Sequence, residues 1–416
     1  MLPPLSGPRL CGIGTRMGAK DRATLRLSIL YGAFFLFVGV YTPYWPVWLE
    51  SLEFTPLQIS LLFGLGPWTR ALANPVAGWL AHRRIARHRL LTGLAVASLL
   101  GYGCFFATRE FAVVFVLMLL IGFLDTPMLP LLDSIALTSR VDFGRVRLWG
   151  SVTFIAASLL GGWLLEDRSE SLVLVLVLSS SLIVALASLL APRTDIPPSS
   201  ATPSASTEDN QVPSRPILYQ LRRPNFPLFL LTCGFLQASH AMLYVFGTLH
   251  WRTIGIDEST IGMLWAEAVV FEVILFWVAG RLKNIFRPAH WLVIAAAGGV
   301  LRWTVLAGAT SLAPLVATQA LHALTFAAMY FGAMEYIRAH TPDRDIAIAT
   351  TLYSALASGV AFGLVIPASG LVYEKFGGAT YFAMAALSAF GLVAALVLLR
   401  RTRARGSTLL ESARAQ

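Results

Sequence analysis

The sequence predicts an all-α integral membrane protein with twelve transmembrane helices in two pseudo-symmetric six-helix bundles. Three observations predict this fold: a very apolar composition, apolar runs of spanning length along the whole chain, and basic residues concentrated in alternate loops. Of the 416 residues, 56% are apolar and only 13% are charged, whereas a soluble domain is about 25% charged. Lipid is therefore the expected solvent for most of the chain.

The individual helices follow from apolar runs near or above about 18 residues, the threshold for a spanning helix. These runs cover residues 27–49, 58–80, 90–108, 111–132, 148–165, 171–191, 226–249, 259–280, 290–309, 312–337, 347–372 and 379–399. Proline interrupts the first run at Pro43 and Pro46, and the seventh at Pro227. Such breaks are tolerated where neighbouring helices or water satisfy the freed backbone groups.

The loops between these runs alternate in charge. With this segmentation, about 26 Lys and Arg residues lie on one face and about 4 on the other. The positive-inside rule then places both termini in the cytoplasm. The net charge of +10 reflects short juxtamembrane clusters suited to anionic lipid headgroups, so we do not expect nucleic acid as a partner.

A linker is expected to divide the chain into two halves. Residues 192–225 are rich in Ser, Pro and Thr and have no apolar face to bury, which indicates a flexible cytoplasmic segment. It separates a six-helix bundle over residues 25–191 from a second one over residues 226–400. Residues 1–24 and 401–416 are expected to be cytoplasmic tails.

The N-terminal tail lacks the apolar stretch of a cleavable signal peptide, and Met17 is an alternative start to Met1. The three cysteines, Cys11, Cys104 and Cys233, have no paired spacing. They indicate neither a disulfide framework nor a zinc site.

An internal repeat supports the two halves. Shifting the chain from Ile59 onto Ile261 also aligns Leu62 with Leu264, Val76 with Val278, Ala77 with Ala279, Gly78 with Gly280 and Leu80 with Leu282. The fifth and eleventh predicted helices both end in Gly-x-x-x-Glu, at Gly162–Glu166 and Gly370–Glu374. Two similar six-helix halves are typical of transporters whose substrate lies between the halves near the bilayer midplane.

Charged residues inside the predicted helices are the candidate functional residues, because each costs roughly 2.5–3.5 kcal/mol on insertion scales. They are Arg70, Asp125, Asp133, Glu267, Glu272, Arg302 and the titratable His322, with Glu335 nearer the inner edge and His240 as a weaker addition. At about 1.5 Å per residue, Glu272, Arg302 and His322 all fall near the midplane. We interpret these three as substrate or proton-coupling residues.

The remaining charges allow more than one interpretation. In the repeat, Arg70 aligns with Glu272, so the two side chains are candidates to pair across a central cavity. Asp133 is expected near the cytoplasmic face, as a gating or structural ion pair with Arg145 or Arg147. Asp125 and Glu267 are further candidates without an assigned role; Glu267 and Glu272 are five residues apart and cannot face one point.

The residues around these positions resemble the lactose permease and phenylpropionate permease branches of the major facilitator superfamily. The stretch Asp142–Ser151 resembles their G-R-x-R-aromatic-G segment, and Leu321–Phe326 followed by Glu335-Tyr336-Ile337 resembles their tenth helix. The positions of Arg70, Asp133, Glu272 and Arg302 also fit this pattern, which covers residues from about 25 to 400.

The resemblance implies proton-coupled symport, with Arg147 as a possible ligand contact and Arg302 and His322 as coupling residues. Two departures stand out. His82 replaces the acid of the G-x-L-x-D-R loop, and Thr325 replaces a proton-carrying carboxylate after the histidine. Glu272 is then the best candidate proton carrier.

We therefore expect a monomeric secondary transporter in a bacterial inner membrane, moving a small organic solute by alternating access. The solute class stays open among aromatic acids, sugars and nucleosides. An efflux antiporter of the same fold is an alternative, and a membrane receptor, enzyme or channel is a more distant one. No enzyme motif occurs, since Gly12–Lys20 lacks the Gly-Lys of a Walker A loop, and no cofactor or metal is expected.

Overall fold

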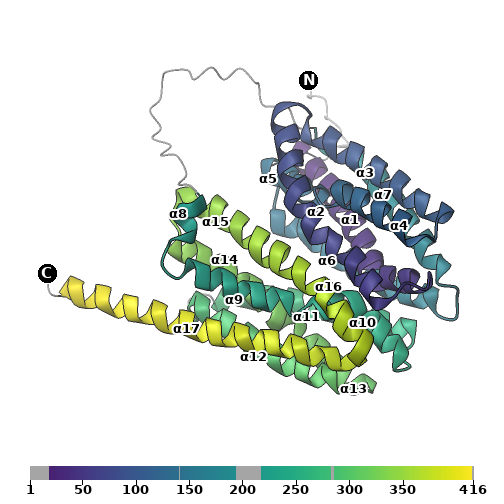
Figure 1. Cartoon of the computed structure of the whole chain (residues 1–416). Coiled ribbons are helices and arrows are strands. Elements are labelled where there is room, and N and C mark those ends of the chain that lie inside the picture. Colours follow the sequence, from purple (N-terminus) through teal and green to yellow (C-terminus); the bar gives the residue numbers. More distant parts are fainter. Residues whose placement is uncertain (1–17, 140, 194–216, 283–284, 415–416) are drawn as a thin grey trace, which may run out of the picture.

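The computed structural model describes residues 18–139, 141–193, 217–282 and 285–414, which are nearly all helical and contain no strand. Figure 1 shows two helical bundles side by side, one from each half of the chain. We call the end where α7 (Ser171–Ser188) finishes and α8 (Ile217–Leu221) begins the linker end, and the other the opposite end.

The first bundle contains six crossings. They are α1 (Ala19–Glu50), α2 (Pro56–Arg83), α3 (Arg87–Cys104) with the short η1 (Phe105–Ala107), α4 (Phe111–Asp125) continued by α5 (Met128–Thr138), α6 (Phe143–Leu165) and α7. Helix α1 stays continuous through Pro43 and Pro46. The fourth crossing instead divides at Pro127, a residue that cannot donate a backbone hydrogen bond.

The second bundle follows the same order with more interruptions. After α8 it has α9 (Phe226–Ala238) with α10 (Ala241–Thr253), α11 (Glu258–Leu282), α12 (Pro288–Ala307), α13 (Leu312–Ala320) with η2 (Ala323–Ala328) and α14 (Met329–His340), then η3 (Asp343–Asp345), α15 (Ile346–Tyr353), η4 (Ser354–Ala361), α16 (Phe362–Phe376), η5 (Gly377–Ala379) and α17 (Thr380–Arg414). Segments η2 and η4 are π-helical turns inside the tenth and eleventh crossings.

The seventh crossing divides at His240, not at the proline that the sequence singled out. Pro227 lies in the first turn of α9, where a missing backbone N–H is harmless. The break falls where the Ser239 hydroxyl and the His240 ring both bind the carbonyl of Leu236, at 2.8 and 2.9 Å. These side chains satisfy the carbonyl that the broken helix leaves unpaired.

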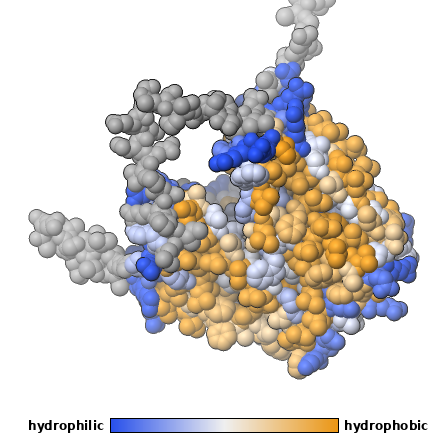
Figure 2. Space-filling model, turned by 45° about the horizontal axis from the view of Figure 1, so that its top comes forward, coloured by the Kyte–Doolittle hydropathy of each residue, from blue (hydrophilic) through white to orange (hydrophobic). Residues whose placement is uncertain are grey.

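The crossings suit a bilayer. Ten helical segments of the described residues are long and apolar enough to span it, and one of them, Asp343–Arg403, is 61 residues long. That stretch turns at Gly377, whose φ of 52° lies in the left-handed region, so it makes two crossings. With α2 as a further crossing, the described chain has the predicted twelve, and Figure 2 shows a broad hydrophobic band edged by hydrophilic residues.

The element boundaries differ from the predicted domain limits. Helix α1 begins at Ala19, inside the expected tail, and α17 runs to Arg414 through the residues expected as a C-terminal tail. Residues 1–17 and 194–216, which include the alternative start Met17 and most of the predicted linker, lie outside the described residues.

The two bundles contact each other along two helix pairs, α6 with α11 and α2 with α16, related by the internal repeat. A Cβ on Gly162 would meet the backbone of Glu258, and one on Gly262 would meet that of Ser158. In the other pair, a Cβ on Gly370 would meet the side chain of Ser60. Glycine is needed at these positions because the helices approach closely, and all of them lie toward the opposite end.

One cation ties the bundles together at the opposite end. Arg252, at the end of α10, donates hydrogen bonds to Glu50 at 3.3 Å, Glu170 at 2.9 Å and Glu258 at 3.0 Å. Glu50 and Glu170 belong to the first bundle and Glu258 to the second. We call these four residues the Arg252 cluster; with the glycine contacts, it closes this end.

Candidate functional site

The second bundle contains a buried cluster centred on Arg302 of α12, whose side chain is fully buried. One guanidinium nitrogen donates to Nδ1 of His322 at 3.0 Å and to the hydroxyl of Thr325 at 3.0 Å, and another donates to Gln319 at 3.0 Å. The guanidinium also lies over the Trp303 ring, 4.6 Å from its centroid. The cation is thus compensated by neutral acceptors and an aromatic face.

These bonds orient His322 toward Glu272. A guanidinium can only donate, so Nδ1 of His322 accepts and the neutral ring carries its proton at Nε2. That nitrogen lies 3.8 Å from a carboxylate oxygen of Glu272 on α11. The structure therefore brings together the three residues that the sequence grouped by depth, with Glu272 the most exposed of them at 23%.

His240 is a fourth member of this cluster. Its Nε2 lies 3.2 Å from the hydroxyl of Thr325, and its ring stands edge-on to those of Trp303 and His322. The sequence indicated His240 only weakly and gave it no role. Thr325 stood out only as a departure from the permease pattern, and Gln319 was missed because neutral polar residues are common in membrane helices.

Arg70 does not pair with Glu272. In the described residues, Arg70 has no charged partner, whereas Glu272 interacts with His322 and, electrostatically, with Arg147 of α6. The reason is geometric. The repeat places Arg70 on α2 against the eleventh crossing, and Glu272 on α11 against the fifth, so equivalent residues face different partners.

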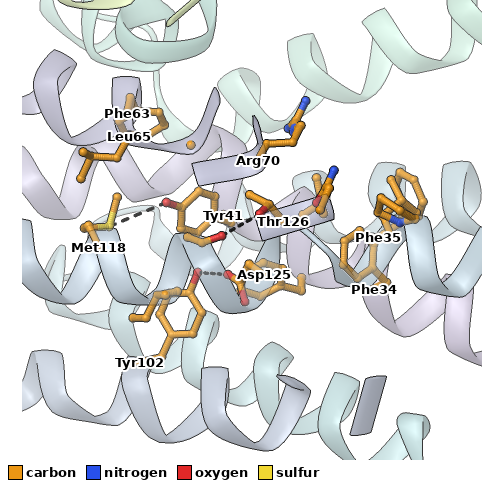
Figure 3. Close-up of a pocket in the computed structure, with 18 of the residues that line it drawn as sticks. Phe34, Phe35, Tyr41, Phe63, Leu65, Arg70, Tyr102, Met118, Asp125 and Thr126 are labelled. Carbon is orange, nitrogen blue, oxygen red and sulfur yellow. Dashed lines mark hydrogen bonds between the residues drawn. The ribbon is translucent and has the colours of Figure 1, made fainter. Parts of the chain in front are cut away.

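Arg70 instead lines a cavity of about 490 Å³ in the first bundle. We call it the aromatic pocket, because rings from three helices form much of its wall; its aromatic lining is Phe34, Phe35, Phe37, Tyr41, Phe63 and Tyr102. Figure 3 shows Arg70 on one side of the central Tyr41 ring, with Asp125 and Tyr102 on the other. Ser354, at the start of η4, also lines the pocket from the second bundle.

Two acids also line the aromatic pocket. Tyr102 donates to Asp125 at 2.7 Å, and the Ser98 hydroxyl binds its other oxygen. Asp133 accepts a hydrogen bond of 2.5 Å from Tyr31 and pairs with Arg147 at 3.7 Å. Of the two arginines proposed as partners of Asp133, Arg147 is the one in contact.

Arg145 lies away from this pair. It is two residues before Arg147, about 200° around the helix, and it lines a separate groove with Lys20 and Trp149. Glu267 has no charged partner among the described residues, and the structure gives it no contact with Glu272 or His322. No group of three potential metal ligands occurs in the described ranges.

The sequence matches known transporters over most of its length. A probable 3-phenylpropionic acid transporter of Escherichia coli K12 is 31% identical over 88% of this chain and 95% of that protein. The maltose permease of Geobacillus stearothermophilus is 27% identical over 95% of this chain and 99% of the permease.

Solved structures share the fold at low identity. The nucleoside transporter NupG superposes with a TM-score of 0.77 at 15% identity, covering 91% of this chain and 98% of that one. A bacterial homologue of the human lysosomal transporter Spinster superposes with a TM-score of 0.66 at 16% identity, covering 93% and 98%.

A family model, described as the MFS_1 like family, matches residues 24–384, which is most of the chain. It agrees with the twelve crossings and with the two bundles that meet along repeat-related helix pairs. The chain therefore belongs to the MFS_1 like family of the major facilitator superfamily, and it is a multi-pass membrane transporter of a small organic solute.

Proposed function

We propose that this transporter takes up a small aromatic carboxylate by proton-coupled symport. The observation that carries the proposal is the aromatic pocket, which combines ring-lined walls with Arg70, a cation without a charged partner in the described residues. A cavity of about 490 Å³ falls in the usual range for small-molecule sites. Aromatic rings pack against an aryl group, and Arg70 binds a carboxylate, ideally with two parallel hydrogen bonds.

The polar groups of the pocket favour an acid over a sugar. A sugar needs a partner for each buried hydroxyl, because every unpaired one costs free energy. Much of the polar lining is already engaged: Asp125 by Tyr102 and Ser98, and Thr126 by a backbone carbonyl. Asn74, one turn after Arg70, has a buried side-chain oxygen without a partner. A solute with one carboxylate, for Arg70, and at most one hydrogen-bond donor, for the Asn74 oxygen, matches this supply. The similarity to a probable 3-phenylpropionic acid transporter supports the same solute class.

Proton coupling is assigned to Glu272 and His322. A carboxylate beside an imidazole at the boundary of the two bundles can take up and release a proton without leaving a buried charge unpaired. Arg302 holds His322 in place through Nδ1, and Arg147 approaches Glu272 from the first bundle. The proton at Glu272 is therefore linked to the relative position of the bundles.

The orientation of the protein in the membrane follows from the unequal charge of the loops on its two faces. The linker end carries most of the basic residues, so we place it, with both termini, in the cytoplasm of a bacterial inner membrane. The structure, closed at the opposite end by the Arg252 cluster, is then the inward-facing state. We propose that a monomer carries out the cycle.

The test is transport by the full-length protein in proteoliposomes. We expect an inward proton gradient to drive accumulation of 3-phenylpropionate, but not of maltose or uridine. Arg70→Gln should lower this uptake at least tenfold, and Arg70→Lys should lower it less because the charge remains. Arg338→Gln is the matched control, since Arg338 is exposed and pairs only with Glu335 one turn away.

Three results would reject the proposal. Gradient-driven accumulation of maltose or uridine in place of the acid would overturn the solute class. Wild-type rates in Arg70→Gln would remove Arg70 from the site. Proton-driven export from the vesicle face that corresponds to the linker end would favour the efflux antiporter.

A further inference from the structure

Asp125 differs from the other acid of the aromatic pocket in what compensates its charge. Asp133 has a cation, Arg147, within 3.7 Å. Asp125 has only two neutral hydroxyl donors, Tyr102 and Ser98, both on α3, and no charged partner in the described residues. Asp125 is partly buried, and a partly buried carboxylate with neutral donors alone is less well compensated than one paired with a cation.

The titratable and charged groups around Asp125 come from every helix that forms the pocket. They are Tyr41 on α1, Arg70 on α2, Tyr102 on α3 and Asp133 on α5. Ser354 is the neutral contribution of the second bundle. Since Arg147 neutralises Asp133, the charge of the pocket depends on Arg70, Asp125 and whatever occupies the pocket.

This balance couples the occupant to the protonation of Asp125. With Asp125 ionised, Arg70 and Asp125 cancel, and an entering carboxylate adds a net negative charge to an apolar enclosure. With Asp125 protonated, Arg70 and the carboxylate cancel. Binding of the carboxylate therefore favours protonation of Asp125, and protonation of Asp125 favours binding of the carboxylate.

We propose that Asp125 is a second proton-binding site, inside the solute pocket, that loads together with the carboxylate. The proton adds to a carboxylate oxygen of Asp125 on solute entry and leaves to water when the solute leaves. This inference rests on the proposed function. Together with the proton at Glu272, it gives about two protons for each monocarboxylate and moves one net positive charge inward.

The first measurement is the coupling stoichiometry, in proteoliposomes with full-length protein and 3-phenylpropionate. The solute gradient that stops net flux is recorded at fixed pH gradient and set membrane potentials. We expect about two protons per solute and potential-dependent flux in the wild type. Asp125→Asn should change this to about one proton and abolish the dependence on potential. Glu267→Gln, an acid-to-amide change outside the pocket, is the matched control and should keep the wild-type stoichiometry.

The second measurement needs no transport. Purified protein is mixed with 3-phenylpropionate in weakly buffered solution, and proton uptake is followed with an indicator dye. We expect the wild type to take up protons on binding and Asp125→Asn to take up measurably fewer, whereas Glu267→Gln, outside the pocket, behaves as the wild type. The unliganded melting temperature and gel-filtration profile verify that each variant is folded.

The outcomes separate the two proposals. Proton uptake on binding that requires Asp125, without gradient-driven transport, upholds the Asp125 site and rejects symport. Gradient-driven transport that is electroneutral in the wild type, or equally potential-dependent in Asp125→Asn, rejects the Asp125 site and leaves symport standing.

Discussion

The two bundles treat their internal charges in different ways. In the first bundle, Arg70 has no charged partner and lines a cavity of about 490 Å³. In the second, Arg302 is fully buried, and its two terminal nitrogens bind Gln319, His322 and Thr325. Related halves have thus kept one arginine open to a ligand and enclosed the other among fixed partners.

This difference indicates a division of roles. An enclosed arginine cannot bind a solute without first losing its partners, so Arg302 is a positioning residue for His322 and Glu272. Arg70 is exposed to water and has no charged partner to lose in the described residues, so it is free to bind an anionic solute. Symport then couples a solute site in one bundle to a proton site at the edge of the other.

Arg302→Ala tests the role of the enclosed arginine and should have the largest effect on stability and uptake. It leaves Gln319, His322 and Thr325 without their shared donor, which should lower stability by about 3 kcal/mol and abolish uptake. Thermal unfolding of the protein in detergent measures the stability, and uptake into proteoliposomes measures the transport. A variant that melts and transports like the wild type, as Arg338→Gln should, would show that the cluster is dispensable.

Glu272→Gln tests the proton site by replacing its carboxylate with an uncharged amide of similar size. We expect loss of gradient-driven accumulation, which one net charge moved across 100 mV (about 2.3 kcal/mol) raises roughly fiftyfold, while exchange of labelled for unlabelled solute continues. The comparison is Glu267→Gln on the same helix, which should keep accumulation because Glu267 does not contact His322. Loss of exchange together with accumulation would move Glu272 from proton coupling to solute binding.

Arg252→Gln should have a smaller effect than the two preceding substitutions. It should shift the balance between the inward-facing state and a state open at the opposite end. It leaves Glu50, Glu170 and Glu258 facing one another without a cation, so the opposite end should open more often. Labelling of a cysteine introduced at Ser51 should become severalfold faster. Arg168→Gln, at the same end, is the control. Unchanged labelling in Arg252→Gln would remove the cluster from gating.

The same cluster predicts a pH dependence. A hydrogen bond from its own backbone and another from Arg252 lower the pKa of Glu170. A lowered pKa means that the contact stabilises closure above the ordinary carboxyl value of about 4.5 and weakens only as pH falls below it. Burial raises the pKa of Glu50 in the same cluster, so protonation of Glu50 favours the closed state. The Ser51 labelling rate should therefore stay constant or fall from neutral pH to about pH 5. A marked rise within that range would contradict this assignment.

The sequence was sufficient for the spans and for grouping Glu272, Arg302 and His322 at one depth, because hydropathy and helix depth are both counted along the chain. It was insufficient where the answer depends on how the bundles face each other. The repeat correctly aligned Arg70 with Glu272, but equivalence under a pseudo-twofold axis does not imply contact. Likewise, the Arg252 cluster joins loop charges that are far apart in sequence and have many alternative partners. The break at His240 depends on two side chains binding one carbonyl, which no proline signals.

The glycine contacts at Gly162, Gly262 and Gly370 have a consequence for the speed of the cycle. At these points no bulky side chain lies between the helices, so one helix can tilt on the other without side chains having to disengage. The glycines can then act as pivots for the rocking of the bundles, and a handful of charges can decide which face of the membrane the pocket meets.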